Sequence, residues 1–205
     1  MDRHGAREPA KSGQSDLDPA DVAPRGYGSV AVAFHWLTAV LVLAAFVVGP
    51  GGSEQRVYSA ANDFDRQIHE VLGLTVFSLT LLRLVSRPFA PAPQWPSAPR
   101  WMNRISKIVQ GLLYTLLVAT PVTAITGAWL EGHPLTLGIL GDVPPMIPEA
   151  HAAGQAVAQI HTILGDTVVW LAGFHAAAAL FHHFVLRDEV LLSMLPARWR
   201  RRRLS

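Results

Sequence analysis

Cysteine is absent from the sequence, and this absence excludes several kinds of chemistry. A chain without thiols forms no disulfide, offers no thiolate to zinc or to an iron–sulfur cluster, and cannot attach a c-type haem covalently. Catalysis by a thiolate nucleophile is excluded for the same reason. Metal ligands must therefore come mainly from the nine histidines.

Charged side chains are also scarce: they make up 16% of the 205 residues, whereas 50% of the residues are hydrophobic. This balance is too apolar for an ordinary soluble domain and indicates an integral membrane protein. The net charge of +2 is too small to indicate a nucleic-acid-binding surface. The first 29 residues lack the apolar core of a cleavable signal peptide, so we expect the chain to be retained whole.

Four apolar stretches are long enough to cross about 30 Å of hydrocarbon at roughly 1.5 Å per residue. They contain few charges and lack the alternation of a barrel strand, so we predict that each is a transmembrane helix. The expected fold is an all-α integral membrane four-helix bundle over residues 27–196, with helices at about 30–50, 68–86, 105–130 and 157–186.

The segments outside these helices are expected to be irregular. Residues 1–26 should form a disordered cytoplasmic tail, and the proline-rich stretch 87–101 should be an extended linker. In the long connection 131–160, the segment from Pro148 to Gln159 is a candidate for a short interfacial helix. The basic tail 197–205 is most simply a topology and lipid-headgroup anchor.

Lysine and arginine are distributed unevenly along the chain. Fifteen of the 17 lie in the N-terminal tail, in the 83–107 connection or in the tail from Arg187, whereas the 131–160 connection has none. By the positive-inside rule, we expect both termini and the 83–107 connection to face the cytoplasm.

Four histidines fall within the predicted helices, where a histidine is costly and usually faces a partner, a cofactor or a water path. His35 lies near the inner end of the first helix, and His69 lies near the outer end of the second. On the fourth helix, His161 lies at the outer level, and His175, 14 residues later, lies about 21 Å deeper on nearly the same stripe. A lone histidine would most simply form a hydrogen bond between helices. These depths instead pair His35 with His175 and His69 with His161, as two b-type haems with two axial imidazoles each would require.

A haem is a flat plate that needs space beside its ligands, and a small residue lies one helical turn after each histidine. These residues are Ala39, Gly73, Gly165 and Ala179, although ordinary helix contacts would give the same pattern. Arg83 lies 14 residues after His69, near the inner level. Its guanidinium could bind a haem propionate or anchor the edge of the membrane.

Transport of zinc or iron is the competing interpretation of the histidines. A transport site would combine imidazoles with carboxylates at the membrane midplane. The acids within the predicted helices are Glu70 and Asp166, and both are expected near the outer surface. Haem binding is therefore the favoured interpretation.

Several motifs make the chain resemble the bacterial cytochrome b561 family, small four-helix di-haem cytochromes of the inner membrane. The resemblance covers roughly residues 27–196 and is most specific in GFHAAAALFHHFVLRDEVLLSMLP at 173–196. FHW at 34–36, LLRLVSRP at 81–88 and the 14-residue histidine spacing support it. The resemblance implies two haem b groups held by the same four histidines, in a protein of the bacterial inner membrane.

The resemblance also implies transfer of single electrons between haem and the membrane quinone pool. It suggests oxidation of periplasmic superoxide at the outer haem and reduction of ubiquinone near the inner haem. Arg66, one turn before His69, is the candidate for guiding superoxide, although it could equally be a solvated loop residue beside an acidic connection. His182, His183 and Trp36 are candidates for binding the quinone headgroup, and Trp36 could also be a ring beside the haem. Anchoring at the membrane interface is the alternative for these three residues.

Two hypotheses of different classes follow. The first is a self-contained superoxide:ubiquinone oxidoreductase. The second is a cytochrome b anchor subunit that carries electrons from a periplasmic dehydrogenase or hydrogenase to quinone. A membrane protein without a cofactor is a weaker third, and the small-residue faces leave room for a homodimer.

Overall fold

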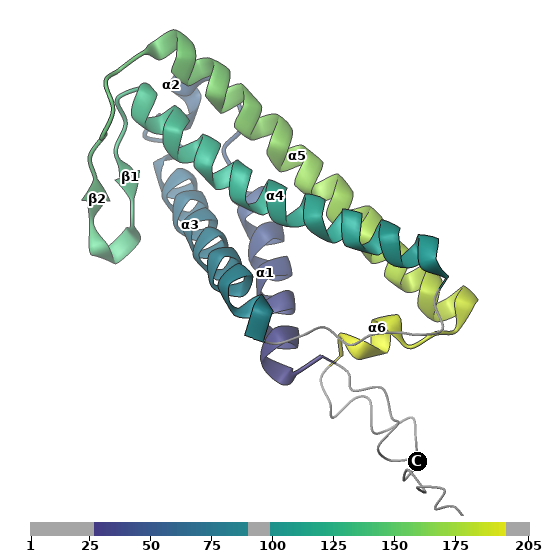
Figure 1. The fold of residues 1–205 in the computed structure, drawn as a ribbon. Coiled ribbons are helices and arrows are strands. Elements are labelled where there is room, and N and C mark those ends of the chain that lie inside the picture. Colours follow the sequence, from purple (N-terminus) through teal and green to yellow (C-terminus); the bar gives the residue numbers. More distant parts are fainter. Residues whose placement is uncertain (1–26, 90–98, 196–205) are drawn as a thin grey trace, which may run out of the picture.

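The computed structural model describes residues 27–89 and 99–195 and arranges four long helices as a bundle (Figure 1). These helices are α1 (Ser29–Val48), α3 (Asp63–Ser86), α4 (Arg100–Leu130) and α5 (His151–Phe181). All four are long and apolar enough to cross a membrane. The predicted all-α, four-helix membrane fold is confirmed. The tail 1–26, residues 90–98 of the proline-rich linker and the tail 197–205 lie outside the described residues.

Three of the helices begin five or six residues before their predicted starts. Hydropathy marks only the lipid-facing part of a helix, and these helices continue into polar sequence. In α3 the first turn carries Asp63 and Asp65, which the positive end of the helix dipole favours. The separate interfacial helix predicted from Pro148 to Gln159 is wrong, because the residues from His151 onward form the first turns of α5.

Short elements close the two ends of the bundle. At one end lie α2 (Glu54–Val57) and a hairpin of β1 (Leu135–Thr136) and β2 (Asp142–Val143), joined by the 3-10 turn η3 (Gly138–Leu140). At the other end lie the 3-10 turn η2 (Arg87–Phe89), the π-helical turn η4 (His182–Leu186) and α6 (Val190–Ser193).

The hairpin was not predicted, since strands of two residues are too short to show alternation. Its strands are antiparallel, with Leu135 opposite Val143. The Thr136 N–H donates a hydrogen bond of 2.8 Å to Oε2 of Glu70 on α3. This bond holds the hairpin against the side of α3.

The bundle is built from two helix pairs, α1 with α3 and α4 with α5. Helices α4 and α5 approach closely at Gly127, where a Cβ atom would lie 3.4 Å from the Ala158 nitrogen and 3.6 Å from the Gly154 oxygen. Small residues allow two membrane helices to pack at this distance. The two pairs meet where α3 contacts α4 and α1 contacts α5.

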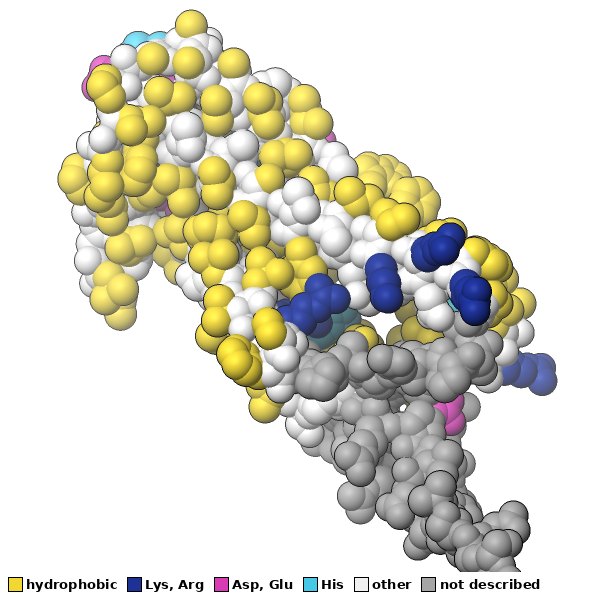
Figure 2. Space-filling view, viewed as in Figure 1, with side chains coloured by type: hydrophobic (Ala, Val, Ile, Leu, Met, Phe, Trp, Pro, Cys, Tyr) yellow, Lys and Arg dark blue, Asp and Glu magenta, His cyan; other side chains and the backbone are white. Residues whose placement is uncertain are grey.

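Basic side chains gather at one end of the bundle. Figure 2 shows lysine and arginine where α4 begins and hydrophobic side chains over most of the remaining face. In α4 these basic residues are Arg100, Arg104 and Lys107. The start of α1 and helix α6 lie at the same end (Figure 1). The positive-inside rule therefore supports our prediction that this end faces the cytoplasm.

Candidate functional site

The four histidines singled out from the sequence form two pairs between helices. His69 on α3 faces His161 on α5, with ring centroids 6.0 Å apart and ring planes at 86°. His35 on α1 faces His175 on α5, with centroids 6.4 Å apart and planes at 75°. We call His69 and His161 the outer pair, and His35 and His175 the inner pair, after the orientation predicted from the charges.

Both separations suit a metal ion between the two rings. With a metal–nitrogen bond of about 2 Å on each side, two imidazoles in line place their ring centroids roughly 6 Å apart. Edge-to-face contact between rings gives similar distances. The hydrogen bonds of the rings distinguish these cases better than the separation does.

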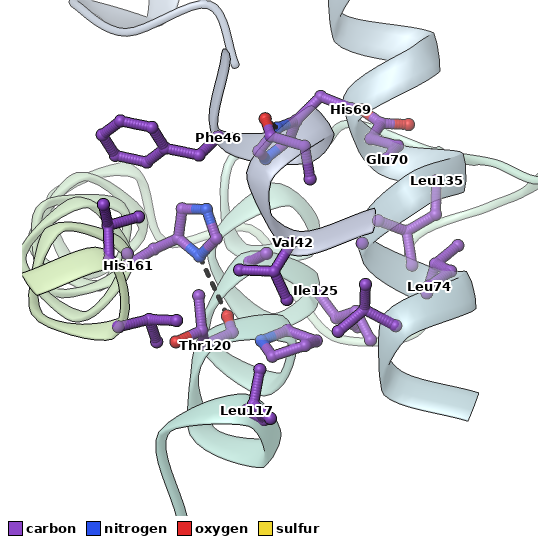
Figure 3. A pocket seen from close by; sticks show the side chains of 18 residues that line it. Val42, Phe46, His69, Glu70, Leu74, Leu117, Thr120, Ile125, Leu135 and His161 are labelled. Carbon is purple, nitrogen blue, oxygen red and sulfur yellow. Dashed lines mark hydrogen bonds between the residues drawn. The ribbon is translucent and has the colours of Figure 1, made fainter. Parts of the chain in front are cut away.

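In the outer pair, both imidazoles are oriented by backbone carbonyl groups. His69 Nδ1 donates to the Ala45 oxygen at 2.8 Å. His161 Nδ1 donates to the Thr120 oxygen at 2.9 Å (Figure 3). A carbonyl only accepts, so the proton lies on Nδ1 and the Nε2 lone pair is left for a metal. The Ala45 carbonyl is available because it is among the last four of α1, which have no partner within the helix.

Gly49, directly after α1, makes the approach of His69 possible. A Cβ atom at Gly49 would lie 3.1 Å from His69 Nδ1 and 3.3 Å from the Ala45 oxygen, closer than ordinary contacts. Sequence reasoning gave Gly49 no role, because a glycine after a helix is an ordinary stop signal.

An apolar pocket lies beside the outer pair. It contains about 810 Å³ of space not filled by atoms, including the part open to its surroundings. Figure 3 shows His69 and His161 at this pocket, together with Val42 and Phe46 from α1 and Leu117 from α4.

Two glycines and one hydroxyl group indicate what the pocket can hold. Gly73 and Gly165 line it, and a Cβ atom at either position would meet no atom within 4 Å. The buried hydroxyl of Thr120, also in the lining, has no hydrogen-bond partner among the described residues. An apolar space faced by two glycines and flanked by two metal-competent imidazoles fits a planar iron cofactor such as haem.

Comparison with known proteins agrees with this fit. The sequence model of the prokaryotic cytochrome b561 family matches residues 26–197. The chain belongs to this family.

Relatives from three bacteria align over most of their length with this cytochrome b561. The "Cytochrome b562" of Cereibacter sphaeroides is 31% identical over 179 residues, which cover 84% of this chain and 97% of the relative. The "Cytochrome b561 homolog 2" of Escherichia coli is 28% identical, covering 84% and 92%. The "Probable superoxide oxidase CybB" of Yersinia pestis is 27% identical, covering 83% and 96%. This chain is accordingly a bacterial membrane protein of electron transfer that uses haem b.

The inner pair of this cytochrome b561 has different neighbours from the outer pair. The Trp36 ring lies 5.6 Å from the His35 ring at 69°, and its Nε1 donates to the Met194 carbonyl at 2.8 Å. The Arg83 guanidinium lies 5.8 Å from the centre of the Tyr114 ring and within electrostatic range of His35. Trp36 thus ties α1 to the end of α6, and Arg83 brings positive charge to the inner level.

The small residues beside the inner pair are at least partly exposed. Ala39 is exposed and Ala179 is half-exposed. Neither lines the pocket of the outer pair. Their expected contact with an inner haem stays a prediction.

The two candidate quinone histidines lie in the π-helical turn η4. His182 Nδ1 donates to Asp188 Oδ2 at 2.5 Å, and the His183 ring meets Phe184 edge-on at 5.0 Å. The turn ends at Arg187, which has a left-handed backbone with φ of 53°. His182 is therefore part of a fixed hydrogen-bonded pair at the basic end of the bundle.

Arg66, the candidate for guiding superoxide, is enclosed by acidic partners. Its guanidinium contacts Asp63 at 2.5 Å and Glu70 at 2.6 Å, and it lies 5.1 Å from the centre of the Tyr58 ring. The Arg66 side chain is only 12% exposed. Burial, and next the Glu70 carboxylate, raises the pKa of the Tyr58 phenol. The two carboxylates compensate the charge of Arg66, which leaves it little positive potential to attract an anion.

Proposed function

We propose that this cytochrome b561 holds one haem b at each histidine pair, oxidises superoxide at the outer end and reduces ubiquinone at the inner end. The observation that carries the proposal is the pair of bis-histidine sites, set about 21 Å apart along α5 by a 14-residue spacing. In the balanced reaction, two superoxide ions, one ubiquinone and two protons give two molecules of oxygen and one ubiquinol.

When bound, haem b supplies an iron that takes up and releases single electrons. The residues of the chain hold and orient it. His69 and His161 present Nε2 while Ala45 and Thr120 fix their ring planes through Nδ1. With both imidazoles of a pair as its ligands, a haem would have no coordination site left for oxygen species, and oxidation of superoxide would be confined to electron transfer.

At the inner end, reduction of a quinone consumes protons. His182, with its Nδ1–H fixed by Asp188, presents its other ring nitrogen as a site for a proton. His183 and Trp36 are the further candidates for contact with the quinone. Arg83 is the candidate for binding an inner haem propionate.

A second candidate function is that of a cytochrome b anchor subunit, which takes electrons from a periplasmic dehydrogenase or hydrogenase. The observation that favours it is the charge of the outer end. The 131–160 connection contains Glu131, Asp142 and Glu149 and no lysine or arginine, and Arg66 is neutralised by its neighbours. Such a surface repels superoxide and suits docking of a protein partner.

The experiment is a stopped-flow assay of the purified, haem-loaded protein, supplied with superoxide and ubiquinone. Haem reduction and ubiquinol formation are followed in the same sample, and superoxide dismutase in a parallel sample removes the substrate. Fast haem reduction that precedes ubiquinol formation and disappears with the dismutase supports the oxidoreductase. Haems that stay oxidised under superoxide would refute it and favour the anchor subunit.

A further inference from the structure

Glu54, Glu131 and His133 come together at the end of the bundle that carries the hairpin. Glu54 lies in α2, Glu131 directly follows α4, and His133 precedes β1. One ligand atom from each of the three lies within 4.8 Å of the other two. Glu54 Oε1 and His133 Nε2 are 3.0 Å apart.

The Glu131 carboxylate has room for a cationic ligand. Glu131 is 7% exposed, and no hydrogen bond to its carboxylate is found within residues 27–89 and 99–195, where His133 and His151 are imidazoles within electrostatic range of it. A largely buried carboxylate without a hydrogen bond is unfavourable, and a bound cation would compensate it. Arg66, a nearby arginine, is engaged by Asp63 and Glu70 instead.

The backbone around Glu131 is shaped to admit its side chain. A Cβ atom at Gly154 on α5 would lie 2.6 Å from Glu131 Cγ, so only a glycine leaves room for the carboxylate to enter. His133 is held from its other side, because the Tyr58 ring stacks on it at 3.4 Å and 17°. Both residues are thus positioned by packing, independently of a ligand.

We propose that Glu54, Glu131 and His133 bind a divalent transition-metal ion of the zinc type. One imidazole with two carboxylates suits such ions, whereas calcium and magnesium prefer oxygen ligands alone. Two ligand atoms of a tetrahedral ion with bonds of about 2.1 Å lie roughly 3.4 Å apart. The distances in the cluster, from 3.0 Å to at most 4.8 Å, bracket this value.

A bound ion links three segments over the outer end of the bundle. It joins α2 to the end of α4 and the start of the hairpin, and Leu135 of that hairpin lines the pocket of the outer pair. The site is separate from the four histidines of the two pairs. It requires neither superoxide nor quinone, so its failure and that of the proposed function are distinguishable.

The test is zinc binding to the full-length, haem-loaded protein in detergent after removal of metals with a chelator. Isothermal titration with zinc gives the stoichiometry and affinity, and X-ray absorption at the zinc edge identifies the ligands. We expect one equivalent of zinc at a site with one imidazole and oxygen ligands at about 2.0–2.2 Å. Glu131→Gln and His133→Gln should each weaken binding by more than roughly tenfold.

The control residues are Asp142 on β2 and Asp65 on α3, which are exposed carboxylates outside the cluster. Asp142→Asn and Asp65→Asn should leave zinc affinity unchanged. The haem absorbance spectrum reports whether a variant is folded. A variant that loses zinc binding supports the proposal only if it retains both haems. No zinc binding by the wild-type protein, or equal weakening in the control variants, would overturn the proposal.

Discussion

Adding a single methyl group at Gly49 tests whether the carbonyl-bound orientation of His69 is required for haem binding. In Gly49→Ala, the new Cβ would lie 3.1 Å from His69 Nδ1, 3.2 Å from His69 Cε1 and 3.3 Å from the Ala45 oxygen. The imidazole or the end of α1 must then shift by a few tenths of an ångström. Either shift strains or breaks the 2.8 Å hydrogen bond from His69 to Ala45.

The size of the effect follows from these contacts. A hydrogen bond of this kind contributes about 1 kcal/mol, and overpacking a close contact typically costs about 1–3 kcal/mol. If the strain falls on the ligand, haem affinity at the outer pair drops by about 1–3 kcal/mol, which is roughly 5- to 150-fold. The inner pair, which Gly49 does not contact, should keep its haem.

The assay measures the haem-to-protein ratio of the purified variant and its low-temperature electron paramagnetic resonance spectrum, which responds to the orientation of the axial imidazoles. Gly51→Ala is the matched control, because a Cβ atom at Gly51 meets nothing within 4 Å. We expect the outer haem signal to shift or disappear in Gly49→Ala alone. An unchanged spectrum and two retained haems would refute the reasoning.

Three further predictions follow from the site. His161→Ala should remove only the outer haem and His175→Ala only the inner haem. The haem content of each variant is measured by absorbance. A variant of either kind that keeps both haems contradicts the ligand assignment. Gly165→Leu fills the outer pocket and should cost one haem per chain. Its helix content, measured by circular dichroism, should be preserved. The control variant Gly111→Leu, at an exposed position on α4, should bind haem normally. Burial raises the pKa of the Tyr58 phenol above its usual 10.0. The buried, neutral phenol therefore contributes its full stability to the fold below pH 10. Above pH 10 this contribution falls, because Tyr58 ionises in the unfolded chain before it does in the folded protein. Tyr58→Phe should therefore flatten the loss of thermal stability above about pH 10, and parallel profiles of the two proteins would count against this.

The fold and the pairing of histidines were accessible from the sequence because both depend on distances along the chain. Apolar length identifies a membrane helix, and the helical rise converts the spacing of His161 and His175 into depth. The residues that orient the outer imidazoles were not accessible in this way. Ala45 and Thr120 contribute backbone carbonyls, which every residue possesses, so no side-chain pattern identifies them.

The neighbours of Arg66 show how a small error in a helix boundary changes a functional interpretation. With α3 predicted to start at residue 68, Arg66 falls in a loop as a free cation. The observed start at Asp63 places Asp63 three residues before Arg66 and Glu70 four residues after it, on one helix face. The same sequence then predicts a neutralised arginine. Hydropathy does not register the polar turns that extend a helix beyond the lipid.

The two histidine pairs lie in surroundings that act on an iron in opposite directions. At the outer pair, both Nδ1–H groups donate to carbonyls, which makes the imidazoles more basic and favours the oxidised iron. No hydrogen bond from a ring nitrogen of His35 or His175 is found in the described part of the chain, and the positive charge of Arg83 at the inner level disfavours the oxidised iron there. In a protein with one haem at each pair, as proposed above, both effects would set the outer potential below the inner one. Electrons received at the outer pair would then move energetically downhill toward the inner pair, which is the direction that the proposed transfer from superoxide to ubiquinone requires. The lower-potential component of a redox titration should therefore be the one that His161→Ala removes.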